Sequence, residues 1–187
     1  HQKTLRNQAT ATVTYDNVFN EKHNVNAMLG GEFFREDYFV LSGATRLSPT
    51  DLITTLNAGA EANGVPSSSK TNYAIASVFG QVNYDYDNRY LLGLTFRQDG
   101  TSRLGTEKYD FFPGVSFGWN LHNENFYESS NVESLVSRIK PRVSYGVNGN
   151  IDVLSNYGVY GLYAETAVYG GQTGYANTNL PTLGLKW

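Results

Sequence analysis

Three charged residues lie in the nine-residue segment RQDGTSRLG at positions 97–105. The carboxylate of Asp99 and the guanidinium groups of Arg97 and Arg103 could together hydrogen bond a polar ligand. The alternative is a structural role, in which an Asp-Arg pair and backbone amides bonding to Asp99 fix the loop, with Gly100 and Gly105 at positive φ. Arg97, Asp99 and Arg103 are therefore candidate ligand-binding residues, and their spacing alone leaves both interpretations open.

The rest of the sequence carries no pattern typical of an enzyme or a metal site. His1, His23 and His122 are dispersed and lack the i, i+4 spacing of a helical metal-binding pair. No Gly-x-Ser-x-Gly segment is present, and the GVNGN segment at 146–150 lacks the lysine of a phosphate-binding loop. We expect no catalytic residues, no metal and no cofactor.

Composition limits the partners that the chain can have. The 14 Lys and Arg residues against 17 Asp and Glu residues give a net charge of -3, which offers no electrostatic support for binding nucleic acid or an anionic membrane surface. Cysteine is absent, which excludes disulfides and thiol chemistry but leaves the cellular compartment open.

The balance of residue types favours β-structure. The chain contains 14 Tyr, 10 Phe and 19 Gly but only one Met, a composition typical of strands and turns. No apolar run reaches the roughly 18 to 20 residues of a membrane-spanning helix. We expect an all-β fold, and the mean hydropathy of -0.39 is compatible with strands that alternate apolar and polar residues.

Apolar and polar residues alternate at the strand period in six segments. Longer connections lie at 41–72, 100–108 and 122–137; the first should contain a short helix starting at Ser48 and a mobile part at 63–70, and the last could hold a helical turn or two. After residue 150 the alternation of apolar and polar residues is weaker, and it does not define the ends of the strands. The predicted strands are 9–16, 23–33, 76–86, 89–97, 111–121 and 139–148, with short turns at 17–20 and 87–88.

Such strands fit either a water-soluble sandwich or a membrane barrel. Three features favour the barrel: short and long connections tend to alternate, aromatic residues lie near strand ends on the apolar face, and charges lie on the other face. The aromatic residues are Tyr15, Tyr84, Tyr86, Tyr90, Phe96 and Trp119, and the charged ones are Arg97, Lys140 and Arg142.

Residues 73–150 resemble the barrel of SusC/RagA-type TonB-dependent outer-membrane transporters. In that family a strand enters an Arg-x-Asp-Gly-Ser-Ser-Arg-Phe-Gly-like loop and returns through a Phe-Pro-Ser-Val-Ser-x-x-Trp-like strand, and a later strand ends in Ser-Tyr-Gly-x-x-Gly-Asn. The chain departs from this pattern at Thr101, Leu104 and Gly114, and residues 1–72 fit only in their alternation. The matching residues include Arg97, Asp99, Gly100, Ser102, Arg103, Gly105, Pro113, Trp119, Tyr145, Gly146, Gly149 and Asn150.

The resemblance implies that residues 1–187 are antiparallel up-and-down strands forming part of a transmembrane β-barrel. About six or seven strands leave two open edges, which are not tolerated in lipid, so we expect a fragment that lacks the plug domain and the other strands. Trp187 would then lie inside the parent chain, because LKW resembles an internal Leu-Lys-Trp-Glu element of the family.

The resemblance also implies a function. The parent would be an importer in the outer membrane of a Gram-negative bacterium, with a SusD-like surface lipoprotein, the TonB-ExbB-ExbD complex and an oligosaccharide or peptide cargo. A soluble or surface carbohydrate-binding or adhesin β-domain is the alternative. Transporters of this family import different cargo molecules, and one shared motif would hardly bind all of them. The structural role of Asp99 and Arg103 is therefore preferred to a role in ligand binding. The loop at 41–72 and the tail after Asn150 are better candidates for cargo contacts.

Overall fold

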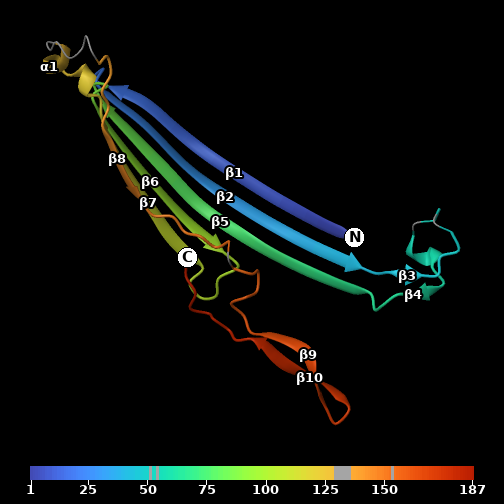
Figure 1. The fold of residues 1–187 in the computed structure, drawn as a ribbon. Helices are drawn as coiled ribbons and strands as arrows, with labels where there is room; N and C mark the ends of the chain where they lie inside the picture. Colours follow the sequence, from blue (N-terminus) through green and yellow to red (C-terminus); the bar gives the residue numbers. More distant parts are fainter. Residues whose placement is uncertain (51, 54, 129–135, 153) are drawn as a thin grey trace.

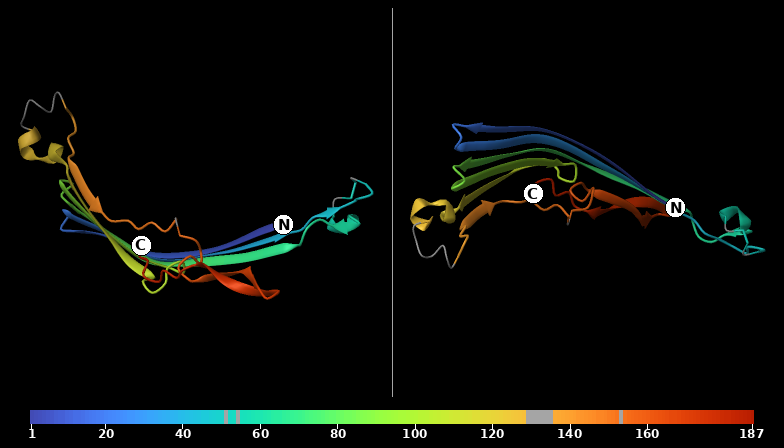
Figure 2. Two further views of the ribbon diagram at one scale, coloured as in Figure 1. Left: turned by 60° about the horizontal axis from the view of Figure 1, so that its bottom comes forward. Right: turned by 90° about the horizontal axis from the view of Figure 1, so that it is seen from above.

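The structure is a computed structural model, and it describes residues 1–187 except 51, 54, 129–135 and 153. Its main element is a curved six-stranded antiparallel sheet in the order β1-β2-β5-β6-β7-β8 (Figure 1). Figure 2 shows that the sheet bends along its length, with α1 beyond one end, β3 and β4 beyond the other, and the β9–β10 hairpin alongside the sheet. The strands are β1 (Gln2–Phe19), β2 (His23–Ser42), β5 (Ser67–Tyr86), β6 (Tyr90–Thr101), β7 (Tyr109–Trp119) and β8 (Arg142–Gly146).

Smaller elements lie in the connections. Two short hairpins consist of β3 (Thr45–Arg46) with β4 (Glu61–Ala62) and β9 (Leu162–Tyr169) with β10 (Gln172–Asn179). The helical pieces are η1 (Leu56–Ala58), η2 (Leu121–Asn123) and α1 (Asn125–Glu128). None of the helices among the described residues is long and apolar enough to cross a membrane. The prediction of an all-β fold with antiparallel up-and-down strands is confirmed.

Two tight turns at one end of the sheet set the strand register. Asp87 and Asn88 both have φ of 53°, and Arg89 N donates to the carbonyl of Tyr86 at 2.9 Å. Positive φ at both central residues defines the type I′ turn, whose twist matches that of the flanking strands, and Asp and Asn tolerate this conformation. We call this end, with the β1–β2 and β5–β6 turns, the short-turn end.

The strands extend further from the short-turn end than the side-chain pattern predicts. β2 continues to Ser42 and β5 begins at Ser67, with Leu41 paired to Ser68. The prediction of a mobile segment at 63–70 is therefore wrong for residues 67–70. Serine side chains add nothing to the apolar pattern, but their backbone groups continue the hydrogen-bonded ladder with β2.

Two further local predictions need correction. At the predicted helix start, Ser48 Oγ donates to the carbonyl of Thr50, and the helical residues come later, in the three-residue 3₁₀-helix η1. Asp51, part of the predicted helix start, lies outside the described residues. The strand predicted at 139–148 is assigned as β8 only over Arg142–Gly146, although backbone bonds to β7 and its end continue on both sides, from Leu121 and Trp119 to Ile139 and Pro141 and from Val147 to Pro113.

The helical turns predicted at 122–137 are confirmed in part by η2 and α1, while residues 129–135 are not described. The described residues bury few apolar side chains. These are Leu104, Phe112, Tyr127, Ile151 and Val159.

Aromatic rings cover glycines on the neighbouring strand. A Cβ built on Gly30 would lie 2.5 Å from the Phe79 ring, one on Gly80 2.5 Å from the Phe96 ring, and one on Gly100 2.2 Å from the Tyr109 ring. Each glycine and its aromatic residue are direct cross-strand partners. The rings thus pack directly on the backbone, and glycine is required for this contact rather than for an unusual φ.

Gly30 and Gly31 are neighbours that test this packing. We predict that Gly30→Val lowers the free energy of unfolding by about 1–3 kcal/mol, because the new side chain displaces the Phe79 ring. Gly31→Val should cause no loss, because the nearest atom to its Cβ is a backbone oxygen 3.7 Å away and valine favours strands. Equilibrium unfolding in urea measures both variants, and equal losses would contradict the explanation.

Candidate functional site

Continuous register gives the sheet one apolar face and one polar face. Val82 on β5, Leu94 on β6 and Val115 on β7 are consecutive cross-strand partners, and Tyr145 on β8 follows Val115. We call this the apolar face. Its side chains are uncovered in the described structure, and the largest include Val13, Leu29, Phe33, Val82, Leu92, Leu94, Phe96, Val115, Phe117, Val143 and Tyr145.

Aromatic residues border the apolar face at both ends. At the short-turn end, the rings of Tyr86, Tyr90 and Trp119 stack in succession, with 6.3 Å between neighbouring centroids. At the other end the rings of Phe96 and Phe111 stack, also at 6.3 Å. The two borders are the arrangement of aromatic girdles at the two interfaces of a membrane barrel.

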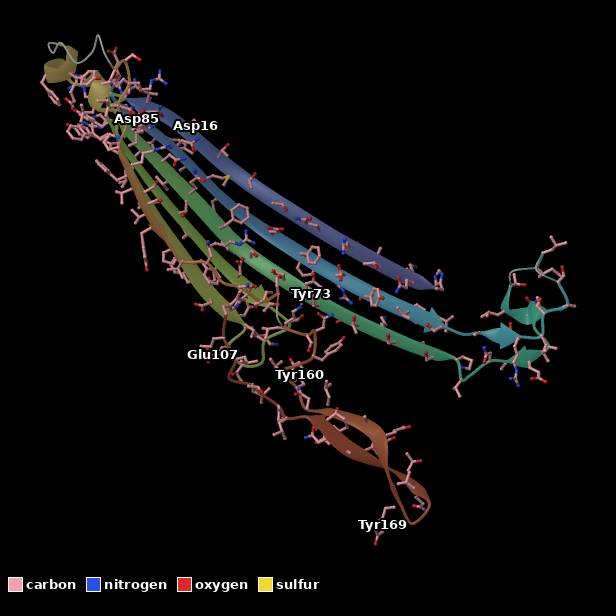
Figure 3. The ribbon with its side chains drawn as sticks, viewed as in Figure 1. Asp16, Tyr73, Asp85, Glu107, Tyr160 and Tyr169 are labelled. Carbon is pink, nitrogen blue, oxygen red and sulfur yellow. The ribbon has the colours of Figure 1, made fainter. Side chains whose placement is uncertain are left out.

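The opposite face, which we call the polar face, has a hollow of about 600 Å³ near the short-turn end. It lies where Gly93, Ser116 and Gly118 leave space between larger polar side chains. Figure 3 shows Asp16 and Asp85 at this end of β1 and β5. The polar side chains that line the hollow include Asn24, Asn83, Asp85, Ser144, Lys140 and Arg142.

Asp85 and two cations line the hollow near the short-turn end. The Oδ1 atom of Asp85 is buried and has no hydrogen-bond partner among the described residues, which is unfavourable for a carboxylate oxygen. Because this atom is closed to solvent, an occupant of the hollow would bond to it only after neighbouring side chains move. Lys140 and Arg142 line the same hollow and can donate hydrogen bonds to an acceptor group.

Arg97 joins several polar side chains on the polar face. Its Nε donates to Asp99 at 2.6 and 2.8 Å, and a terminal nitrogen donates to Ser77 Oγ at 2.9 Å. The same nitrogen lies 3.5 Å from a Glu32 oxygen, and the guanidinium lies 5.5 Å from the centre of the Phe79 ring. Arg97 is thus held by four side chains from three strands.

A second cavity, of about 320 Å³, brings distant motif residues together. It is lined by Arg97 and Asp99 from β6 together with Pro113, Gly146 and Gly149. Gly149 lies close under the rings of Phe112 and Trp187. The cavity therefore joins parts of the two motif segments, Arg97, Asp99 and Pro113 from the first and Gly146 and Gly149 from the second.

Arg103 lies apart from Asp99 and forms different contacts. Its guanidinium stacks on the Tyr73 ring at 3.9 Å from the centroid, and its Nε donates to Asn156 Oδ1 at 2.9 Å. Ser102 pairs with Ala74: Ser102 N donates to the Ala74 carbonyl at 3.0 Å, and Ala74 N donates to Ser102 Oγ at 2.9 Å. The motif loop is thereby fixed to β5 and to the segment around residue 156.

Two details of the predicted structural role are wrong. Gly100 and Gly105 do not have positive φ; instead their Cβ positions are occupied by the Tyr109 ring and by the Leu183 backbone, respectively. Among the described residues, Asp99 accepts hydrogen bonds from the Arg97 side chain and not from backbone amides. Whether Arg97, Asp99 and Arg103 contact a ligand stays a prediction.

The other motif residues have separate positions. Trp119 is at the short-turn end, Tyr145 is exposed on the apolar face, and Asn150 Oδ1 accepts a bond from Asp152 N at 2.9 Å. His23 contacts the Tyr84 hydroxyl at 2.7 Å, and His122 contacts the carbonyl of Ile139 at 3.0 Å. Within the described residues, no three His, Cys, Asp or Glu side chains are placed to bind a metal.

Glu124 is an important polar residue that sequence motifs do not identify. Trp119 Nε1 donates to Glu124 Oε1 at 3.0 Å, and Arg89 lies 3.6 Å from the other oxygen. Hydrogen bonds from Trp119 and then Tyr90 hold the pKa of the Glu124 carboxyl below its ordinary value. The carboxylate thus connects η2 to the aromatic border at the short-turn end. Nothing in the sequence around Glu124 distinguishes this residue from the other acidic residues.

Comparisons with known proteins agree with this geometry. The chain is 29% identical over 175 residues to TonB-dependent receptor P39 of Formosa agariphila, covering 92% of this chain and 16% of that protein. It is 33% identical over 124 residues to TonB-dependent receptor SusC of Bacteroides thetaiotaomicron, covering 63% of this chain and 12% of SusC. No family model matches the chain.

The fold is similar to that of a solved transporter. The RagAB peptide transporter structure aligns with the whole chain and with 20% of its own chain, at a TM-score of 0.85 and 24% identity. The chain spans a fifth or less of the length of these relatives.

The fold and its two faces define the class of protein: this is part of the wall of a transmembrane-type β-barrel. Within that class, a further match, of 32% identity over 181 residues and 94% of this chain to TonB-dependent receptor P3 of Formosa agariphila, identifies the chain as a barrel segment of a TonB-dependent receptor of the SusC/RagA type. The relatives are receptors and transporters rather than enzymes. The predicted family is thus confirmed.

Glu124 provides a pH-dependent test of the short-turn end. A carboxyl whose pKa is lowered by folding stabilises the protein above its unfolded value, here 4.5, and this stabilisation is lost as pH falls through the lower folded value. We predict that the urea midpoint decreases below that pH, and that Glu124→Gln weakens this decrease. Glu21→Gln, at an exposed position in the β1–β2 turn, is the control. An unchanged pH profile in Glu124→Gln would contradict the assignment.

Proposed function

We propose that the chain forms part of the barrel wall of an importer in the outer membrane of a Gram-negative bacterium. The observation that carries this proposal is the two-faced sheet, in which the long strands present mostly apolar side chains to one side and mostly polar side chains to the other between the short-turn end and Phe33. In a closed barrel the apolar face contacts lipid and the polar face lines the interior. TonB-dependent receptors are outer-membrane proteins, and the similarity to them supports this location.

The dimensions of the apolar face support a membrane-spanning role. On β2, ten residue steps separate His23, paired with Tyr86 of the short-turn border, from Phe33, the last apolar-face residue before the charged Arg35. At about 3.3 Å per residue and a tilt of about 40°, this corresponds to roughly 25 Å of height. That value matches the apolar band of about 25 Å around outer-membrane barrels. A soluble carbohydrate-binding or adhesin domain would instead need to cover this face.

The transport activity is proposed from the relatives. We infer that the parent receptor imports oligosaccharides or peptides with energy transmitted through TonB, ExbB and ExbD, and that a SusD-like lipoprotein works with it. Similarity to SusC and to the fold of the RagAB peptide transporter supports this inference. The hollow near Asp85 and the cavity near Arg97 would then face the barrel interior, while residues 43–66 and the segment after Asn150 would contact cargo at the outer surface.

A charge placed on either face tests the orientation of the sheet. Val82 and Gln81 are neighbours on β5 that face opposite sides, and Val82 lies midway between the aromatic borders. We predict that Val82→Arg lowers folding stability in lipid vesicles by about 2–4 kcal/mol, because the guanidinium enters hydrocarbon. Gln81→Arg should cost much less. Folding titrations of the full receptor in phosphatidylcholine vesicles measure the difference, and the reverse order would contradict the assignment of faces.

Uptake experiments test the import function itself. Cells that carry the full receptor should accumulate labelled oligosaccharides or peptides, and deletion of the receptor or of TonB should abolish that accumulation. A protonophore should have the same effect, because energy reaches the receptor from the proton gradient. A passively permeating small sugar is the control. Cargo uptake that continues without TonB would contradict active import even if the barrel folds in lipid.

A further inference from the structure

Charged residues are divided unequally between the two faces of the six-stranded sheet. In these fully described strands, the apolar face carries Lys3, Arg35 and Lys70 and the single carboxylate of Asp37. The polar face is acidic, with Arg6, Arg97, Arg142, Asp16, Glu32, Glu36, Asp85, Asp99 and Asp110. The apolar face thus has a local excess of positive charge, although the whole chain has a net charge of -3.

All four charged residues of the apolar face are at its end far from the short turns. Phe39 on β2 is the direct partner of Lys3 on β1 and of Lys70 on β5. Strands lie about 4.8 Å apart, so the two lysine backbones are separated by about 10 Å. Flexible lysine side chains can close this distance around one anionic group. We call Lys3, Arg35 and Lys70 the basic patch.

Asp37 reduces but does not neutralise the basic patch. Arg35 binds it through two hydrogen bonds, of 2.9 and 3.0 Å. These bonds, and more weakly the charge of Lys70, hold the pKa of Asp37 below its usual range, so the carboxylate is charged at neutral pH. Three cations and one anion leave a net charge of about two. This excess remains available to an external anion.

The basic patch directly continues the proposed lipid-facing surface. It begins two residues beyond Phe33, where the apolar band ends, and extends to the row of Phe39 (Figure 1 shows these outer parts of β1, β2 and β5). The same rise and tilt as above place Arg35 roughly 5 Å, and the row of Lys3 and Lys70 roughly 15 Å, beyond the hydrocarbon. Headgroups occupy about 5–7 Å on each side, and lysine side chains can reach back toward this layer along the apolar surface.

We propose that Lys3 and Lys70 bind the phosphate of an anionic lipid headgroup in the membrane leaflet on the long-loop side, while Arg35, held by Asp37, adds positive charge between them and the apolar band. The proposal rests on the barrel function argued above. Continuity with the apolar face favours a lipid over a free anion, because acyl chains would lie against Phe33 and Leu29 while the phosphate meets the cations. The positive charge of the basic patch favours a headgroup with a net negative charge over a zwitterionic one.

The test measures lipid binding by the full receptor in detergent micelles. The Lys3→Gln/Lys70→Gln double variant should bind phosphatidylglycerol more weakly, by roughly fivefold for each lysine removed, as measured by native mass spectrometry. Phosphatidylcholine binding should not change. Arg6→Gln is the matched control, because Arg6 is on β1 near Lys3 but faces the other side and pairs with Glu36 at 2.6 Å.

Three outcomes distinguish the possibilities. Selective loss of phosphatidylglycerol binding in the lysine variant supports the proposal. Equal loss in Arg6→Gln, or full competition by inorganic phosphate, would overturn a lipid site at the basic patch while leaving the barrel function intact. Folding into phosphatidylcholine vesicles is measured separately, and a wild-type receptor that does not insert would overturn both proposals.

Discussion

Unbroken in-register pairing is the constraint on which the rest of the structure depends. Because side chains alternate along a strand, a one-residue shift in any pair would move an entire set of apolar residues to the opposite face. The pairing from β1 through β7 contains no such shift. The apolar face, the hollow beside Asp85 and the Arg97 cluster all follow from this pairing, since each combines side chains from three or more strands.

Glycine residues shape the two faces of the sheet at positions where a larger side chain would occupy the space above the backbone. At Gly30 and Gly80, the missing side chain lets an aromatic ring from the next strand pack on the backbone. Gly93 and Gly118 line the hollow on the polar face; at Gly93 the missing side chain leaves room for Ser116, whose Oγ would lie 2.4 Å from a Cβ there. Glycine therefore serves two different purposes in one sheet: close packing near Arg97, and an open, polar interior surface near the short-turn end.

Sequence periodicity predicts the two faces well because alternation records which side of a strand is apolar. It does not predict the ends of β2 and β5, since Ser67 and its neighbours pair through backbone groups that carry no side-chain signal. The motif identifies Arg97 and Asp99, but not Ser77 and Glu32, which complete the cluster from other strands. Asp85 and Glu124 are likewise defined by three-dimensional neighbours, which local spacing cannot encode.

The net charge of the chain conceals an organised separation of charge. Averaging along the sequence mixes the acidic polar face with the basic patch, although β2 carries Arg35 and Glu36 in consecutive positions on opposite sides. On the polar face, Arg97 bonds to the carboxylates of Asp99 and Glu32 and so offsets part of their burial cost. On the apolar face carboxylates are fewer and cations dominate, so each face has the charge that suits a different environment. A strand that crosses a membrane thus uses alternation to separate charge as well as hydrophobicity.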